Sequence, residues 1–439
     1  MAHTSVRRKP PCTRKDATAV LRRLREAGYE AYFAGGCVRD LLLGLEPTDW
    51  DVATSAPPAR VRELFPRTQA VGQAFGVILV YQGRSVVEVA TFRSEGDYRD
   101  GRRPGRVRFT TAQEDAARRD FTINGLFLDP LDGDRIIDFV GGREDLAARR
   151  LRAIGDPHER FREDHLRLLR AVRFAARFDL TVEEQTAAAI AAAAPMLTRI
   201  SPERCGDELR LMLCPPSRAA AWRLLWKFGL LHVLFRFLPV PADVRLHEAR
   251  SPMMHLAPGR EAPFGLALAA GVLCAHASAG AREDELLAAM ARDRATHAVR
   301  AMRRALRISN EESDDMSGAL EGLAPLLSEP PPRVAVLRRF LAGPAAGLSR
   351  VLMEALHSAG FFRQRIEWLR AELSRWATAL PLPAPLINGD DLKDAGLPPG
   401  PLFKRILDAV YDAQLEGRVC DHDAALHLAM SLAREERSV

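Results

Sequence analysis

The chain has 439 residues, of which 47% are hydrophobic and 27% are charged, a composition typical of a globular protein with roughly two to four domains. Its formal net charge of +6 fits a polyanionic partner, although an excess of this size does not require one. No apolar run is long enough to span a membrane, and the six cysteines show no C-x-x-C pair, so we expect reduced thiols in a cytoplasmic protein without membrane association.

The first third of the chain alternates helical and strand patterns. Apolar residues from Ala17 to Leu24 recur at helical spacing, which predicts an N-terminal helix. Val-rich runs on either side of Gly83 predict a hairpin, and the charged, Gly-rich residues 93–106 predict a mobile loop. The alternation predicts a mixed α/β head, with helices at 16–27, 38–43, 57–64 and 113–128 and strands at 29–34, 50–53, 76–81, 85–91 and 135–139.

From Arg143 onward the pattern is helical, with interruptions at residues 238–262 and at two proline-rich stretches. We therefore expect three helical parts after the head: a neck, a body and a tail. The predicted division is head 16–141, neck 142–237, body 238–380 and tail 381–439.

Two aspartates, Asp49 and Asp51, lie two residues apart behind a glycine pair, Gly35 and Gly36. In a strand such acids point to the same side, where their charges repel unless a cation lies between them. Mg²⁺ is the hard, oxygen-binding cation that suits this arrangement. Because glycine has no Cβ, phosphate groups can approach the main-chain N–H groups of the pair closely. Either feature alone is common in loops, but together they indicate metal-dependent phosphoryl chemistry on a nucleotide.

The segment from Gly35 to Asp51, with Gly-Gly-Cys-Val-Arg-Asp followed by Asp-Trp-Asp, resembles the signature of the class II tRNA nucleotidyltransferase (CCA-adding enzyme) and bacterial poly(A) polymerase superfamily. The resemblance implies an α+β fold, in which a polymerase β-like nucleotidyltransferase head precedes an all-helical neck, body and tail. It implies that Asp49 and Asp51 are catalytic residues and ligands of Mg²⁺. It further implies that Gly36 and Arg39 bind the nucleotide, and that the partners are tRNA, CTP and ATP, with no protein partner evident.

Glu88 stands between two valines on an expected strand. A carboxylate among apolar neighbours is costly to bury without a cation or another partner. Two interpretations stay open: a third catalytic carboxylate beside Asp49 and Asp51, or a strand acid that faces solvent.

The run from Arg118 to Asn124, Arg-Arg-Asp-Phe-Thr-Ile-Asn, resembles a second motif of the same superfamily. A guanidinium group offers forked donors that fit phosphate or ribose oxygens. We therefore expect Arg119 to bind the nucleotide.

A third motif, Glu-Asp-x-x-Arg, places Asp164 three residues before Arg167, so the two would be neighbours on a helix. Cytosine and adenine both present an amino donor beside a ring-nitrogen acceptor, whereas guanine and uracil present a carbonyl and a ring N–H. A carboxylate beside a guanidinium can therefore select cytosine and adenine without a nucleic-acid template. A surface ion pair of little energetic value is the alternative. The run resembles the family's amino-acid template, which implies that Arg170 and Arg173 hold the triphosphate and that the segment 201–209 braces the helix.

Three activities share these motifs: addition of CCA, addition of only the C's or only the terminal A, and poly(A) synthesis. The residues Val71 to Ile78 lack the basic pair typical of bacterial poly(A) polymerases. The segment 95–104 resembles the loop needed for adding A, and the run from Ile387 to Pro401 resembles a tRNA-binding tail. We expect template-independent addition of CCA, or of the terminal A alone, to the tRNA 3′ end. A poly(A) polymerase and a catalytically silent RNA-binding protein on the same scaffold are the alternatives.

Overall fold

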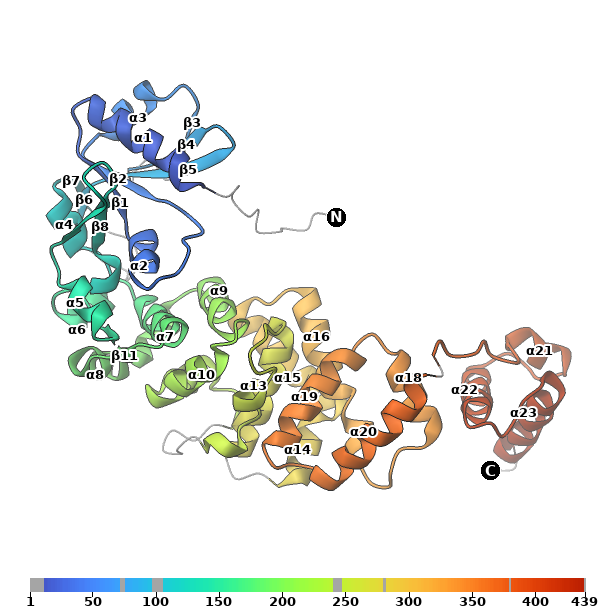
Figure 1. Ribbon diagram of the computed structural model, residues 1–439. Helices are drawn as coiled ribbons and strands as arrows, with labels where there is room; N and C mark the ends of the chain where they lie inside the picture. The colour runs from blue at the N-terminus through green and yellow to red at the C-terminus, as the bar shows by residue number, and fades with distance from the viewer. Residues whose placement is uncertain are drawn as a thin grey trace. The chain divides into compact units, whose positions relative to one another are not determined.

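The computed structural model describes residues 12–71, 76–96, 106–239, 247–278, 282–378 and 380–437. The chain divides into two compact units, one of residues 1–212 with 224–234 and the other of residues 213–223 with 235–439 (Figure 1). The first unit contains the β-sheet, and the second is helical. Across the described ranges, no helix is both long and apolar enough to cross a membrane. The finer division at residues 141, 237 and 380 stays a prediction.

A seven-stranded mixed sheet forms the head, in the order β3-β4-β5-β2-β1-β8-β9. Neighbouring strands are antiparallel except β2 and β5, which are parallel. The strands are β1 (Ala31–Ala34), β2 (Val52–Thr54), β3 (Thr68–Ala70), β4 (Val77–Gln82), β5 (Ser85–Thr91), β8 (Leu126–Asp129) and β9 (Arg135–Asp138).

Four helices accompany this sheet: α1 (Arg14–Glu26), α2 (Gly36–Leu42), α3 (Pro58–Leu64) and α4 (Ala112–Ala117). Helix α1 begins at Thr13, whose side chain accepts a hydrogen bond from the Asp16 N–H, and it buries the predicted apolar stripe against the strands. The β4–β5 hairpin turns at Gly83, which has a positive φ of 60°. The first three helices, the five strands and the hairpin that the pattern predicted are confirmed here, with shifts of one or two residues at their ends.

The single helix predicted over 113–128 is wrong. The structure has the short helix α4, a 3₁₀ turn η2 (Thr122–Asn124) and then β8, which pairs between β1 and β9. A short apolar run such as that of β8 reads equally well as helix or strand, and the unpaired sides of its neighbouring strands decide the outcome.

The loop predicted over 93–106 is wrong at both ends, because β6 (Arg93–Gly96) and β7 (Arg106–Phe109) pair antiparallel. Residues 97–105, with most of the A-addition loop motif, lie outside the described residues, as do residues 72–75 of the poly(A) polymerase comparison.

The junction after the sheet is a turn held by one carboxylate. Asp138 accepts hydrogen bonds from the main-chain N–H groups of four residues, Val140 to Arg143, at 2.9–3.1 Å. A Cβ on Gly142 would lie 2.2 Å from the Thr122 carbonyl oxygen, so glycine is required there. Gly142 at this junction therefore allows a close approach of two backbone segments, and its N–H group is bonded to Asp138.

Helices follow this turn in the first unit: α5 (Gly142–Ala147), α6 (Pro157–Glu163), α7 (Arg167–Phe178), α8 (Glu184–Ala193), η3 (Ala194–Arg199), α9 (Pro202–Leu213) and α11 (Leu230–Leu234). A two-residue parallel pair, β10 (Arg150–Leu151) and β11 (Thr181–Val182), ties α7 back to the chain before α6. Helix α10 (Arg218–Lys227) belongs in part to each unit.

The second unit contains η4 (Glu248–Arg250), α12 (Pro252–His255), α13 (Phe264–Ser278), α14 (Glu283–Met290), α15 (Arg292–Leu306), α16 (Asn310–Glu321), α17 (Ala324–Leu327), α18 (Val334–Ala342), α19 (Ala346–Ser358), α20 (Arg363–Ala377), α21 (Gly389–Asp394), α22 (Pro401–Leu415) and α23 (His422–Arg437). The last three helices share an apolar cluster of their own around Leu392 and Ile406. Arg339 on α18 pairs with Asp412 on α22 at 2.8 Å.

Candidate active site

A cavity of about 560 Å³ lies in the first unit, between the sheet and α7. Nine of the ten predicted site residues line it, and Asp49 is the exception. The nine are Gly36, Arg39, Asp51, Glu88, Arg119, Asp164, Arg167, Arg170 and Arg173. The acids Asp51 and Glu88 and the predicted base-selecting residues Asp164 and Arg167 therefore line the same cavity.

The register of β2 and β5 brings two acids of this cavity together. Val52 pairs with Val89 in the parallel ladder, so one residue earlier on each strand Asp51 lies beside Glu88 on the same face. Both side chains line the cavity, which favours the interpretation of Glu88 as a site residue over that of a solvent-facing acid.

Asp49 and Asp51 precede β2 rather than lying within it, which differs from the strand placement that the pattern predicted. Trp50 between them is buried, and its ring packs 4.8 Å from that of Phe33, whereas Asp49 is exposed. Of the two acids, Asp51 lines the cavity and Asp49 does not.

The donor set fits a hard divalent cation. Carboxylate oxygens are the ligands that Mg²⁺ prefers, and it completes its coordination with water and substrate phosphates. In the described ranges no three His, Cys, Asp or Glu side chains gather as a ready-made metal site.

The glycine pair forms the other wall of the acid end. Gly35 has a φ of 73°, and a Cβ there would lie 2.8 Å from Nη1 of Arg119, so only glycine fits without displacing that side chain. Gly36 is the first residue of α2 and lines the cavity. Burial, and then the charge of Asp51, raise the pKa of Cys37 to about 12, so a neutral thiol faces that acid.

Arg39 is almost fully buried and bonded on several sides. It donates to Asp40 at 2.6 and 2.8 Å and to the Asn124 side-chain oxygen at 2.7 Å, and its guanidinium lies 4.4 Å from the Phe178 ring centroid. Burial lowers the pKa of this guanidinium, which Asp40 partly offsets. Arg39 thus joins α2, η2 and α7, and its predicted contact with nucleotide is added to this bracing.

Arg119 is held in a similar way by the head. It donates to Asp115 at 2.8 Å through Nη2 and to the Asn124 carbonyl oxygen at 3.0 Å through Nη1. Its guanidinium lies 5.0 Å from the Phe127 ring centroid.

Asp164 and Arg167 do not sit together on a helix, contrary to the prediction. Asp164 follows the last turn of α6, and Arg167 begins α7. Arg204 donates to both Asp164 carboxylate oxygens, at 3.1 and 3.2 Å, while Arg167 donates to Glu163 at 2.6 Å. Each member of the predicted pair is therefore fixed by another partner, and both still line the cavity.

The segment predicted to brace the template helix does so. Besides the Arg204 contact, Glu208 on α9 accepts from Arg173 at 2.7 Å and lies 4.0 Å from Arg170. Burial lowers the pKa of Arg173 and raises that of Glu208. Although burial acts in the opposite direction, the charges of Asp120 and Glu208 raise the pKa of Arg170.

Several other polar residues line the cavity and were not predicted: Arg93, Arg118, Asp120, Asn124 and Arg177. Asp120 and Asn124 belong to the second motif, where their place next to Arg119 was the available signal. Arg177 lies one helical turn beyond Arg173 on α7, so the repeat of Arg170 and Arg173 could have indicated it.

Asp120 gives the first unit a pH dependence. Although burial raises its pKa, the charge of Arg170, at 2.7 Å, lowers it from the usual 3.8 to about 2. The ionised form contributes stability above pH 3.8, and this is lost as pH falls toward 2. We expect the difference in unfolding free energy between wild type and Asp120→Asn to shrink by about 2 kcal/mol between pH 5 and pH 2. Urea unfolding at pH values across this window measures it, and a difference independent of pH would contradict the assignment.

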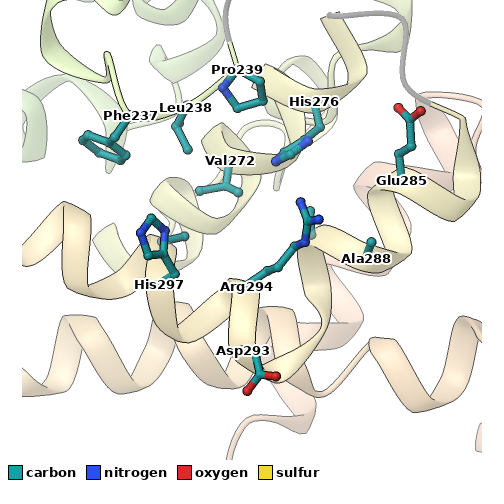
Figure 2. A pocket seen from close by; sticks show the side chains of 12 residues that line it. Phe237, Leu238, Pro239, Val272, His276, Glu285, Ala288, Asp293, Arg294 and His297 are labelled. Atoms are coloured by element: carbon teal, nitrogen blue, oxygen red, sulfur yellow. The ribbon is translucent and has the colours of Figure 1, made fainter.

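A second cavity, of about 760 Å³, lies in the second unit between α13, α14 and α15 (Figure 2). Figure 2 shows His276, Arg294 and His297 around it. Its two acids, Glu285 and Asp293, come from different helices, and none of its described lining residues is a glycine. It therefore lacks the chemistry of the cavity in the first unit.

Acids and a glycine turn on a mixed sheet, facing a row of arginines on α7, are typical of a nucleotidyltransferase site. Family models agree with this class: the "Poly A polymerase head domain" matches residues 31–152, and the "Probable RNA and SrmB- binding site of polymerase A" matches residues 179–240.

Relatives extend the likeness to the whole chain. The CCA-adding enzyme of Geobacillus kaustophilus is 36% identical over 416 residues, 94% of each chain. The crystal structure of the Bacillus stearothermophilus CCA-adding enzyme in complex with CTP is 30% identical, with a TM-score of 0.69 over 97% of this chain and 98% of that one. Poly(A) polymerase I of Haemophilus influenzae is 39% identical over 234 residues, only about half of each protein.

The chain belongs to the family of CCA-adding enzymes, the class II tRNA nucleotidyltransferases. The predicted α+β head followed by helices is confirmed, and CCA addition rather than poly(A) synthesis is the activity of the full-length relatives.

Proposed function

We propose that this enzyme adds the complete CCA sequence to the tRNA 3′ end, taking CTP and ATP in turn without a nucleic-acid template. The observation that carries the proposal is the shared cavity, which is lined both by Asp51 and Glu88 of the head and by Asp164 and Arg167. The full-length likeness to proteins named CCA-adding enzymes supports the whole sequence over the terminal A alone.

The acids next to β2 and on β5 would hold Mg²⁺, with Asp49 and Asp51 as ligands and Glu88 beside them. When bound there, Mg²⁺ would lower the pKa of the tRNA 3′-hydroxyl and offset charge on the departing pyrophosphate. The 3′-oxygen bonds to the α-phosphorus as the bond from this phosphorus to the bridging oxygen of the β-phosphate breaks. Gly36 and Arg119 orient the nucleotide, and Arg170 and Arg173 bind its phosphates.

Base selection falls to Asp164 and Arg167. The Asp164 carboxylate accepts from the amino group of cytosine or adenine, and the Arg167 guanidinium donates to the adjacent ring nitrogen. Uracil and guanine place an acceptor opposite the carboxylate and a donor opposite the guanidinium. Because Arg204 and Glu163 hold the two side chains in place, selection needs little rearrangement.

The test offers purified enzyme a tRNA that ends at the discriminator base, at C or at CC, with labelled CTP, ATP or both. We expect extension of all three to the same CCA end, and no further. Extension of the CC-ended tRNA alone would mean A addition only. Long A tracts on unrelated RNA would favour a poly(A) polymerase, and no incorporation with Mg²⁺ present would favour a silent RNA-binding protein.

A further inference from the structure

Arg160 lies on α6 behind the predicted base-selecting arginine, outside the cavity lining. Its Nε–H donates to the Ile154 carbonyl oxygen at 2.9 Å. Its Nη1 donates to the Arg118 carbonyl oxygen at 3.2 Å and to Oε2 of Glu163 at 3.0 Å. One side chain thus links the Arg118 carbonyl group, the chain just before α6 and Glu163 at the end of α6.

Arg167 shares two of these acceptors. Its Nη1 donates to the same Oε2 of Glu163 at 2.6 Å, and its Nη2 donates to the Arg118 carbonyl oxygen at 3.3 Å. Its Nη1 also donates to the Arg160 carbonyl oxygen at 3.0 Å. Glu163 is therefore clamped between two guanidinium groups, and Arg167 is held by an acid that Arg160 holds in turn.

These contacts decide which donors of Arg167 remain for a base. Among the described residues, the Nε–H of Arg167 has no acceptor, and Nη2 uses one of its two hydrogens. Nη1 is fully committed. The Nε–Nη2 edge of the guanidinium group therefore retains unused donors, and Arg167 lines the cavity.

We propose that Arg160 is a positioning residue for nucleotide selection, which fixes the Glu163 carboxylate so that Arg167 presents its Nε–Nη2 edge to cytosine or adenine. This inference rests on the proposed function, because it assigns Arg167 to the base. Without Arg160, Glu163 has one guanidinium partner in place of two and a side chain that is one-quarter exposed, so it can take other rotamers. Arg167 then follows the acid and meets uracil and guanine with less discrimination.

The experiment compares Arg160→Gln with wild type, using kcat/KM for CTP against UTP on tRNA ending at the discriminator base, and for ATP against GTP on CC-ended tRNA. We expect both ratios to fall about tenfold. Arg162→Gln is the matched control, because Arg162 is an exposed arginine two residues away on the same helix; its ratios should equal those of wild type. Glu163→Gln keeps the shape of the shared acceptor, removes its charge and should also lower both ratios.

Thermal unfolding of every variant separates selection from folding. Equal slowing of all four nucleotides in Arg160→Gln, with unchanged ratios, would overturn the inference and leave a purely structural role. If Arg160→Gln does not fold, the kcat/KM ratios of Glu163→Gln replace it: lowered ratios support the inference, and unchanged ratios overturn it. Absence of CTP incorporation by the wild type would count against the proposed function, whereas an active wild type with unchanged ratios in the folded variants would count against this inference alone.

Discussion

Replacing Asp51 with asparagine is expected to leave a folded protein that incorporates CTP and ATP at least ~10³-fold more slowly than the wild type. The substitution removes one negative charge from the acid end of the cavity, where Asp51 lies beside Glu88. Asparagine keeps the size of the side chain and the Asp51 carbonyl oxygen, which accepts from the Ala34 N–H at 3.1 Å. The main-chain contact between Asp51 and Ala34 should therefore persist, while the carboxylate that would bind a divalent cation is lost.

Single-turnover incorporation of labelled CTP, together with the melting temperature, measures this effect. Asp132→Asn is the control, since Asp132 is an exposed aspartate of the same sheet, in the turn between β8 and β9, and pairs with Arg135 at the surface. Its rate should match the wild type. A rate for Asp51→Asn within tenfold of the wild type would contradict the role of this acid.

Replacing Arg218 with methionine is expected to lower the unfolding free energy by about 3–5 kcal/mol. The Arg218 side chain is 1% exposed. It donates to five main-chain carbonyl oxygens of the second unit, those of Leu213, Cys214, Leu256, Ala257 and Arg260. Methionine fills a similar length but donates nothing, so all five carbonyl groups lose the Arg218 donors, and among the described residues only those of Cys214 and Ala257 keep a main-chain N–H donor.

Urea unfolding of the whole chain tests this expectation. Arg223→Met on the same helix is the matched control, because Arg223 forms a half-exposed ion pair with Glu248 and should cost less than about 1 kcal/mol. Equal losses of stability in the two variants would show that the carbonyl cluster does not depend on Arg218.

Sequence patterns predicted those elements of the head whose structure depends on residues close together in the sequence. The stripe from Ala17 to Leu24 forms a helix because its spacing matches a helical face, and the Gly35 turn needs a positive φ that glycine adopts readily. The short run Leu126–Asp129 was assigned to a helix because its apolar residues carry no decisive period. Its place between β1 and β9 comes from strands distant in sequence.

The sequence predicted which residues belong to the candidate site, but it did not predict which side chains they contact. Resemblance to a family selected Asp164 and Arg167, and the cavity contains both. Their partners, Arg204 and Glu163, follow from how α6, α7 and α9 pack, and spacing within one helix cannot show that. Sequence patterns did not identify Arg160, because one of its contacts is with Arg118, 42 residues earlier, and spacing within a helix does not reveal such a contact.

The most direct test of the account is a structure of the enzyme with Mg²⁺ and a CTP analogue that cannot react. We predict that the cytosine amino group lies within hydrogen-bond distance of the Asp164 carboxylate and its ring nitrogen within that of Arg167, while the cation contacts Asp51. A cytosine ring bound out of reach of both neck residues, with the cation away from Asp51, would contradict it.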